Sequence, residues 1–394
     1  MLLRAGATVA LLLICLRLNA QDYDSAVIGC DTISYKYTAL DQTPHPAEFG
    51  LKLYDYMNLL PEEKKMANFS VMGGPGYSEH RGWQLTLHGD LQYRSPRHKS
   101  LINGLTIYTT VSLRRYYDVG IVGFNYLKSE RHRLSYRASI TSAPTYLYGL
   151  DFSQSSTDDR GLYTDKTYRA EICYNWQISE LFNIGVHADY RHAEAINLNA
   201  EAQAIVAQRP TMYSGGGIGL CGELSTHKIL DINYQRGVVI SADIALRPKF
   251  LGTYAHSLWQ FTADVRYYHP LWKWALLAFD AYGQYHSYHT PWMLRSAVGS
   301  DSRMRGYYAS RYNGNTLVGA QLELRQRVWE GLVVACWGGT AVAFSPDDRF
   351  KWQHLLPNYG VGIRWYLSTK AALRIDLGFG RHGHGFVVGL SEAF

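Results

Sequence analysis

The stretch WQLTLHGDLQYR, from Trp83 to Arg94, alternates strictly between two kinds of residue. The odd-numbered positions are apolar or aromatic, with one glycine: Trp83, Leu85, Leu87, Gly89, Leu91 and Tyr93. The even-numbered positions are polar: Gln84, Thr86, His88, Asp90, Gln92 and Arg94. Because successive side chains of a β-strand point to opposite faces, this period of two predicts a strand with one apolar and one polar face.

The same alternation returns in many segments from residue 67 to the end of the chain. Clear examples are 168–176, 182–191, 259–267 and 373–380. Strands of about 10 residues suit a tilted crossing of a bilayer, whereas strands of soluble proteins average about 5–6 residues. A soluble β-sandwich would also alternate, with its polar face in water. The polar faces here mix acids with arginines, which favours the water-filled, ion-paired lumen of a membrane barrel.

We count sixteen strand segments, and bacterial membrane barrels have an even number of strands. The segments are 67–77, 82–94, 102–114, 119–128, 131–142, 165–177, 181–193, 213–224, 236–248, 256–268, 272–286, 316–328, 332–344, 358–368, 370–380 and 384–394. Short connections alternate with long ones, and the long ones are 144–164, 194–212, 287–315 and 345–357. Because backbone groups in lipid must all be hydrogen-bonded, only a closed sheet serves. The predicted fold is all-β: a sixteen-stranded antiparallel transmembrane β-barrel.

Three regions are expected along the chain. Residues 1–20 combine a positively charged residue near the N-terminus, a short apolar core and a small residue at the expected cleavage site. This pattern predicts a secretory signal peptide. Residues 21–66 are expected to form a periplasmic N-terminal tail, in which 51–60 is either one short helix or a loop that orders on the barrel. Residues 67–394 are expected to form the barrel, in the outer membrane of a Gram-negative bacterium.

Charge and cysteine content argue against several classes of function. Without residues 1–20 the chain loses two arginines and no acids, so its formal charge falls from +6 to +4. That charge is too small to favour nucleic acid as a partner. The cysteines beyond residue 20 are too widely spaced for a zinc motif or a dense disulfide framework: Cys30, Cys173, Cys221 and Cys336. We therefore predict no metal site and no cofactor.

One long connection differs from the others in composition. Its end, DSRMRGYYASRYNGN at 301–315, is rich in Tyr, Arg and Gly and precedes the twelfth strand segment. Arg305 is a permanently charged donor that suits a carboxylate in a narrow polar space. Gly306 lets the backbone turn tightly, and Tyr307 combines an apolar ring with a polar tip.

Glu323 is the candidate partner of this arginine. It falls on the predicted lumen face of the twelfth strand, together with Arg325. The alternative is an arginine in solvent on a surface loop. Other charged or titratable residues are also predicted to face the lumen: His88, Asp90, Arg169, Glu171, His187, Asp189, Arg191, Asp264, Arg266, Arg364 and Asp376. Their mixed signs indicate ion pairs across the lumen more than a selective filter.

Several motifs, in their order and spacing, resemble the bacterial surface-antigen barrel of the BamA/TamA outer-membrane assembly superfamily. Residues 304–307 are similar to its [VIL]-R-G-[FY] motif, and 323–325 to the E-x-R of the following strand. Residues 359–364 and 373–378 match the later repeats, and 73–77 looks like the first strand. The resemblance covers the whole of the predicted barrel.

The resemblance implies that the long loop folds back into the lumen as a lid, with Arg305 held by Glu323. The chain departs from the family on the thirteenth strand, where an acid in a D-x-G pattern commonly gives the arginine a second contact. Trp337 stands at that position, so a cation–π contact would have to substitute. Well-known members also carry POTRA domains, for which residues 21–66 are too short. The G-x-S-x-G signature of members with a lipase domain is absent.

The family mechanism implies weak pairing between the first and last strands, so that a lateral seam opens toward lipid. The first strand contains residues that would weaken pairing: Gly73, Gly74, Pro75 and Gly76. Glycine lowers strand stability, and proline lacks the N–H that a ladder needs. A plain bend or bulge is the alternative. The last strand is expected to close the seam and to end on an aromatic residue, Phe394.

Three functions remain open. The resemblance favours a non-enzymatic outer-membrane barrel that inserts or translocates proteins. Its partners would be lipid, nascent outer-membrane or secreted proteins and a periplasmic protein in place of POTRA domains. The second is a passive channel or uptake pore, since a sixteen-stranded barrel is wide enough for one. The third is an enzyme, but the pairs His286/His289 and His382/His384 have no adjoining acid or cysteine. A homodimer is compatible with all three.

Overall fold

The computed structural model describes residues 24–28, 31–35, 67–78, 81–94, 101–127, 129–231, 233–329, 331–346, 348, 350–368, 371–389 and 392–394. The signal peptide predicted at 1–20 and the helix considered at 51–60 lie outside the described residues. Within the predicted tail, β1 (Asp24–Ile28) and β2 (Asp31–Tyr35) pair as an antiparallel hairpin that the sequence pattern did not predict.

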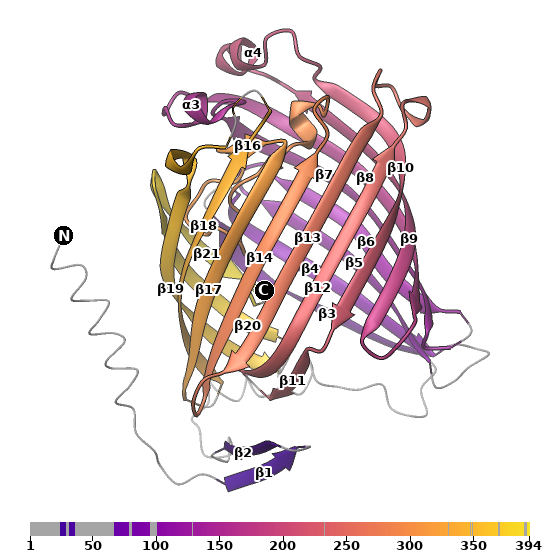
Figure 1. The fold of residues 1–394 in the computed structure, drawn as a ribbon, viewed down its shortest axis with the longest axis vertical. Helices are drawn as coiled ribbons and strands as arrows, with labels where there is room; N and C mark the ends of the chain where they lie inside the picture. Colours follow the sequence, from indigo (N-terminus) through magenta and orange to yellow (C-terminus); the bar gives the residue numbers. More distant parts are fainter. Residues whose placement is uncertain are drawn as a thin grey trace, which may run out of the picture.

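Sixteen strands of the described chain close into an antiparallel barrel, which confirms the predicted fold (Figure 1). They are β3 (Ala67–Ser78), β4 (Gly82–Arg94), β5 (Ile102–Ser112), β6 (Tyr117–Tyr126), β7 (His132–Leu147), β8 (Gly161–Gln177), β9 (Phe182–Ile196), β10 (Met212–Ser225), β12 (Tyr234–Arg247), β13 (Leu258–Pro270), β14 (Ala275–His286), β17 (Thr316–Trp329), β18 (Leu332–Phe344), β19 (Leu356–Ser368), β20 (Ala371–Gly380) and β21 (Gly383–Gly389). These strands pair in chain order, and β21 returns to β3. A short strand, β11 (Lys228–Asp231), adds to β12.

Strand boundaries lie close to the predicted ones except in two places. Strand β7 continues through Pro144 to Leu147 and β8 begins at Gly161, so the loop predicted at 144–164 is shorter. The register of β6 ends opposite Ser142, so β7 then has a neighbour on one side only, where a missing N–H is tolerated. The last strand was predicted wrongly, because β21 ends at Gly389 and not at residue 394.

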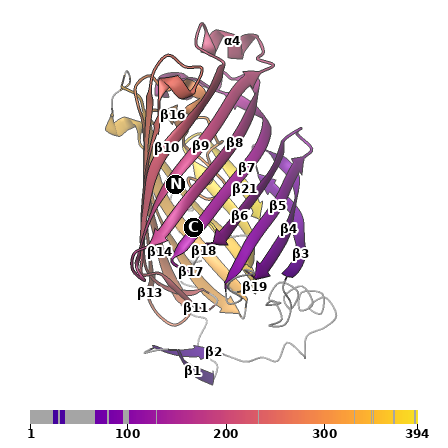
Figure 2. The same ribbon diagram turned by 90° about the vertical axis from the view of Figure 1, so that its right-hand side faces the viewer.

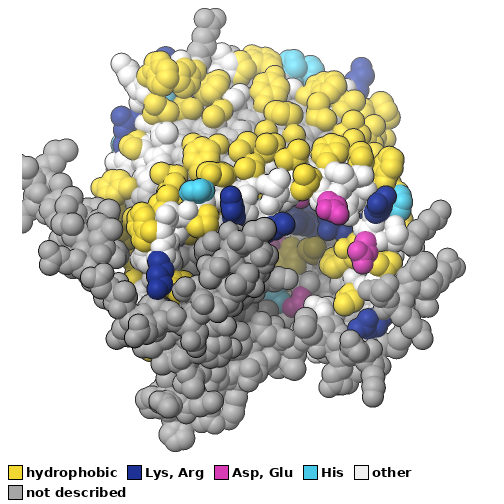
Figure 3. Space-filling view, turned by 60° about the horizontal axis from the view of Figure 1, so that its bottom comes forward, with side chains coloured by type: hydrophobic (Ala, Val, Ile, Leu, Met, Phe, Trp, Pro, Cys, Tyr) yellow, Lys and Arg dark blue, Asp and Glu magenta, His cyan; other side chains and the backbone are white. Residues whose placement is uncertain are grey.

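Apolar side chains cover the outer wall, and polar ones line the interior. On β4, Leu85 and Leu87 are 45% and 43% exposed, whereas Asp280 of β14 and Glu323 of β17 are fully buried. Figure 3 shows hydrophobic side chains over the outer wall and charged side chains around the hollowed lower opening. The alternation that predicted the strands therefore separates a lipid-facing surface from a charged interior.

The two ends of the barrel differ. The upper end in Figures 1 and 2 carries the long connections. They include α3 (Phe152–Ser155), α4 (Ala200–Val206) and the 3₁₀ turns η2 (Lys249–Leu251), η3 (Trp292–Leu294) and η4 (Trp352–His354). The lower end carries the short turns and β11, and the chain enters the barrel there. None of the helices in the described chain is long and apolar enough to cross a membrane.

The longest connection, residues 287–315, folds into the barrel, and we call it the in-folded loop. Its short strands β15 (Ser296–Ala297) and β16 (Asn313–Gly314) pair with each other. Its apolar side chains are buried in one cluster with residues of the wall: Val298, Met304, Tyr307 and Tyr312 from the loop, and Tyr282, Leu317, Ala341, Ala343 and Leu356 from the strands and strand ends. The loop is therefore packed against the inner wall.

Candidate functional site

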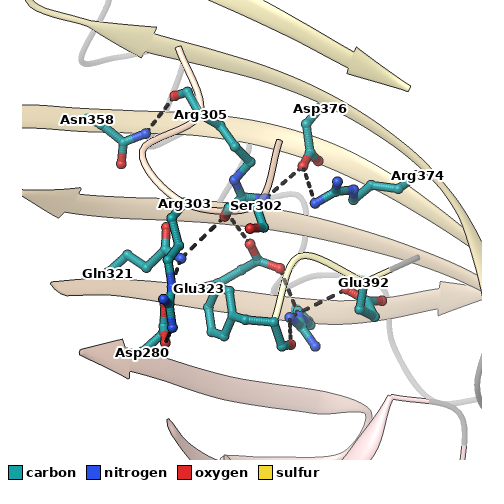
Figure 4. Close-up of polar contacts among 12 residues, drawn as sticks. Asp280, Ser302, Arg303, Arg305, Gln321, Glu323, Asn358, Arg374, Asp376 and Glu392 are labelled. Atoms are coloured by element: carbon teal, nitrogen blue, oxygen red, sulfur yellow. Dashed lines mark hydrogen bonds and ion pairs between the residues drawn. The ribbon is translucent and has the colours of Figure 1, made fainter. Parts of the chain in front are cut away.

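Arg305 of the in-folded loop lies between two carboxylates of the barrel wall (Figure 4). Its Nη2 is 2.5 Å from Glu323 Oε2 on β17, and its Nη1 is 2.7 Å from Asp376 Oδ2 on β20. All three side chains are fully buried. Because a buried charge is stable only when it is paired and hydrogen-bonded, these contacts fix the position of the guanidinium group.

Trp337 of β18 covers the face of the same guanidinium group. The Cζ atom of Arg305 lies 3.5 Å from the centre of the indole ring, which is a cation–π contact. The residue that stands in place of the family's acid therefore touches the arginine. The second carboxylate comes from Asp376 on β20, two strands beyond Trp337. Strand alternation predicted that Asp376 faces the lumen, but not that it binds Arg305.

The strand register explains how these groups fit together. Glu323, Trp337, Gly360 and Gly378 are paired in one row across β17, β18, β19 and β20. A Cβ atom at position 360 would lie 2.3 Å from Trp337 Cζ2, and one at position 378 would lie 2.2 Å from the carbonyl oxygen of Arg305. The two glycines therefore leave the space that the indole ring and the loop backbone occupy.

Gly306 and Tyr307 hold the loop against the same part of the wall. Gly306 has a φ of +111°, a conformation that residues with a side chain rarely adopt. The hydroxyl of Tyr307 donates to the carbonyl oxygen of Pro357 at 2.6 Å and accepts from the N–H of Arg381 at 2.9 Å. This tyrosine therefore ties the loop both to β19 and to the turn between β20 and β21.

Three more arginines surround the two carboxylates. Arg325 Nε donates to Glu323 Oε1 at 2.8 Å. Arg364 bridges both acids, with Nη2 3.2 Å from Glu323 Oε1 and Nη1 bonded to Asp376. Arg374 Nη1 lies 3.6 Å from Asp376 Oδ2. Arginine is therefore in excess at this site, and a later segment of the same chain supplies another carboxylate.

That carboxylate comes from the tail after β21, which turns into the lumen. Glu392 Oε2 is 3.3 Å from Arg364 Nε and 3.4 Å from Arg325 Nη2. The carbonyl oxygen of Phe394 accepts from Arg325 Nη2 at 3.1 Å, and its ring packs on a buried cluster: Tyr268, Leu276 and Ala278. The prediction that Phe394 closes the seam is wrong, because the tail binds these arginines inside the barrel.

Arg303 forms a second attachment of the loop that the sequence did not reveal. Its Nε and Nη2 donate to the two oxygens of Asp280 at 2.8 Å each, and Nη2 is 2.5 Å from Asp264 Oδ1. Its Cζ lies 4.2 Å from the centre of the Tyr282 ring. Strand alternation placed Asp264 in the lumen. It gave no sign of which loop residue would meet that acid, because the path of a long loop is not periodic.

The edge between β21 and β3 has little strand pairing. Within the described residues these strands share one registered pair, Val388 with Tyr77. Strands β20 and β21 share seven such pairs, and β3 and β4 share twelve. The predicted seam residues Gly73, Gly74, Pro75 and Gly76 all lie in β3. A Cβ atom at position 76 would lie 3.1 Å from the carbonyl oxygen of Val388, so Gly76 stands at the joint itself.

The structure is similar to three solved barrels. CdiB from Acinetobacter baumannii is 16% identical, with a TM-score of 0.54, and the match covers 83% of this chain and 60% of that one. BamA from Haemophilus ducreyi lacking POTRA domains 1–3 is 12% identical, with a TM-score of 0.58, and 97% and 78% are covered. CdiB from Escherichia coli is 12% identical, with a TM-score of 0.56, and 95% and 69% are covered.

The chain thus spans 60% of the length of the Acinetobacter protein. No family model and no curated protein matches the sequence. At these identities the similarity concerns the arrangement of the backbone. The described chain is a sixteen-stranded barrel, and its fold is similar to those of BamA and CdiB.

Proposed function

We propose that the chain is an outer-membrane β-barrel that inserts proteins into the membrane or translocates them across it. The apolar outer wall and the charged interior support a membrane-spanning barrel. The fold shared with BamA and CdiB supports the class of barrel. In this proposal the in-folded loop is a lid held at Arg305, and the edge between β3 and β21 is a lateral gate.

The observation that carries the proposal is the weakly paired edge. One registered pair joins β21 to β3, so separating these strands breaks fewer backbone hydrogen bonds than separating β20 from β21 or β3 from β4. A polypeptide that leaves the lumen sideways needs such an opening. A passive pore does not need one, and its lumen would not be expected to hold a packed loop and a bound tail.

The same proposal orients the barrel. The chain enters at the lower end, so residues 21–66 would lie in the periplasm and the long loops would face outward. A periplasmic partner would then deliver client proteins to the lower opening, in place of POTRA domains. Residues 1–20 would act as the signal peptide that brings the chain there.

A disulfide across the seam tests the gate. Tyr77→Cys with Val388→Cys places two thiols on paired residues. The native cysteines are replaced by serine, since the sulfurs of Cys173 and Cys221 lie only 3.7 Å apart and would compete. Oxidation is expected to stop the insertion of a model outer-membrane protein into proteoliposomes, and a reductant is expected to restore it.

A matched cross-link on a continuous pair of strands is the control. Leu85→Cys with Val111→Cys joins paired residues of β4 and β5, where no opening is proposed. This cross-link is expected to leave insertion unchanged. If the protein locked at the seam inserts its client as fast as the reduced protein does, lateral opening is not part of the function.

A further inference from the structure

Two cysteines meet on the inner face of the barrel wall. Cys173 lies on β8 and Cys221 on β10, and their Sγ atoms are 3.7 Å apart. The preceding residues, Ile172 and Leu220, are exposed on the outer face, so strand alternation directs both thiols into the lumen. Cys173 is buried and Cys221 is half-buried. The carboxylates that hold Arg305 lie on β17 and β20, so this pair belongs to a different part of the wall.

A glycine on the strand between them lets the two thiols approach each other. Gly185 of β9 is paired with Cys221, and His187, two residues further along β9, is paired with Cys173. A Cβ atom at position 185 would lie 2.7 Å from Cys221 Sγ, which is closer than packed side chains come. Gly185 therefore leaves the hollow in which side chains of β8 and β10 meet across β9.

The backbone keeps this pair from closing into a disulfide. Strand β9 lies between β8 and β10, and neighbouring strands are about 4.8 Å apart, so the two Cα atoms are about 9–10 Å apart. A disulfide needs Cα atoms about 4.4–6.8 Å apart and sulfurs about 2 Å apart. A direct bond between Cys173 and Cys221 would therefore require the strands to move. The two sulfurs are better placed to hold an atom between them.

The separation of the sulfurs suits a single metal ion. A metal–thiolate bond is about 2.3 Å long, so two sulfurs on one ion lie up to about 4.6 Å apart. The 3.7 Å between these two sulfurs is within that limit. The contacts that the thiols would give up are weak, because a thiol is a poor hydrogen-bond donor and Asn175 Oδ1 is 3.9 Å from Cys221 Sγ. An ion could therefore bind both sulfurs with the strands in place.

The number of ligands indicates which metal fits. In the part of the chain that the structure describes, no third His, Cys, Asp or Glu joins the two sulfurs in a group that could hold a metal ion. His187 instead extends over Gly219 to β12, where its Nε2 is 2.8 Å from Asp243 Oδ2. Structural zinc takes four protein ligands. Thiolates select Cu(I) among the soft ions, and Cu(I) is stable with two of them.

We propose that Cys173 and Cys221 bind one Cu(I) ion in the lumen. Each thiol releases its proton when its sulfur binds the metal, so two protons leave and a bis-thiolate site with one negative charge forms. The bound ion would tie β8 to β10 across β9. The proposal does not depend on protein insertion or translocation, so either can fail without the other.

Competition with bicinchoninate, a chelator that is coloured when it holds Cu(I), tests the site on the full-length chain in detergent with ascorbate. All samples carry Cys15→Ser and Cys30→Ser, which leaves Cys173, Cys221 and Cys336 as the thiols. The chain is expected to take one equivalent of Cu(I) from the chelator. Zn²⁺ at the same concentration is expected not to displace it, because two ligands are too few for zinc.

X-ray absorption on the copper-loaded chain identifies the ligands without a further substitution. Two sulfur neighbours at about 2.3 Å are expected around the copper. A shell made of nitrogen and oxygen would place the ion elsewhere in the protein.

Single substitutions then assign the two sulfurs. Loss of a group that merely supports a ligand costs metal sites about 10–100-fold in affinity, so Cys173→Ser and Cys221→Ser are each expected to weaken Cu(I) binding by about 100-fold or more. Cys336→Ser is the matched control, because Cys336 lies on β18, which is not a neighbour of β8, β9 or β10. This variant is expected to bind as its parent does.

Four results would overturn the proposal. The first is that the chain takes no Cu(I) from the chelator. The second is binding that survives Cys173→Ser or Cys221→Ser, or a copper ion without sulfur neighbours. The third is displacement of Cu(I) by an equal concentration of Zn²⁺. The fourth is the loss of two thiols from the folded chain after treatment with oxidised glutathione, which would show that the pair closes into a disulfide instead.

Discussion

Arg305 is held by charge, by hydrogen bonds and by an aromatic ring at once. Removing one partner of a buried ion pair typically costs about 3–5 kcal/mol, because the other charge stays buried without compensation. Exposed pairs are worth about 0–1 kcal/mol. The position of the in-folded loop is therefore expected to depend on Arg305, Glu323 and Asp376 far more than on exposed ion pairs such as that of Lys351 with Asp348.

Gly360→Ala tests the row of glycines behind this arginine. The new methyl group would lie 2.3 Å from Trp337 Cζ2, so the indole ring has to move away from its place against Arg305. We expect the free energy of unfolding to fall by about 1–3 kcal/mol, as for other overpacked sites. Urea titration in detergent, followed by tryptophan fluorescence, measures it.

Gly338→Ala on the neighbouring strand is the control for this substitution. The nearest atom to its new methyl group is the carbonyl oxygen of Asn358 at 4.0 Å, which leaves room. Its effect is expected to stay within about 0.5 kcal/mol. If the two variants lose the same amount of unfolding free energy, the glycine at position 360 is not needed to make room for Trp337.

Residue-level prediction from the sequence placed side chains on the correct faces and named Glu323 as a partner of Arg305, but it missed the other partners. Strand alternation placed Glu323, Asp376 and Asp264 in the lumen, because the direction of a side chain depends only on its own strand. Strand alternation could not show that acids of β17 and β20 bind the same guanidinium group. That contact depends on the curvature of the wall and on the path of the loop. Asp376 was therefore missed as a partner of Arg305.

At the scale of elements, the strands were predictable because their signal is local and repeated. The ends of a strand were harder to predict where its two neighbouring strands end at different heights. Strand β7 is an example, because β6 pairs with it only as far as Ser142. The last strand was predicted five residues too long, because it was expected to end on the aromatic residue Phe394. Ion pairs of Glu392 with Arg325 and Arg364 hold the tail in the lumen. A strand pattern in the sequence does not predict such pairs.

Glu392→Gln tests how the tail is held. The amide loses the ionic contacts with Arg325 and Arg364, so we expect a loss of about 1–3 kcal/mol in unfolding free energy. The tail should also leave the lumen more often. Carboxypeptidase is then expected to release Phe394 faster than from the unmodified chain.

Glu223→Gln supplies the comparison for the tail. This glutamate lies on β10 and is exposed, so its neutralisation is expected to change neither stability nor the release of Phe394. If Glu392→Gln behaves like Glu223→Gln in both assays, the ion pairs do not hold the tail.

At the scale of the whole molecule, closure follows from one requirement. A sheet with an apolar outer face in lipid leaves no backbone group unpaired only if its last strand returns to its first. The number of strands and the short and long ends were therefore predictable. The resemblance also implied that the long loop folds into the lumen. The position of the tail inside the lumen was not predicted, because it depends on contacts between residues far apart in the sequence.

Deleting residues 21–66 tests whether the barrel stands alone. All sixteen strands lie beyond this segment, so we expect the shortened chain to fold in detergent with the same β-rich circular dichroism and the same urea midpoint. Failure of the shortened chain to assemble would make the segment a structural part of the barrel and not a periplasmic tail.

In the proposed function the in-folded loop closes the lumen and Arg305 holds it there. Single-channel recording in planar bilayers tests it directly, with the unmodified chain, Arg305→Ala and the exposed control Arg209→Ala. We expect little conductance from the unmodified chain and from Arg209→Ala, and a several-fold larger conductance from Arg305→Ala. A large, steady conductance from the unmodified chain that Arg305→Ala leaves unchanged would contradict it.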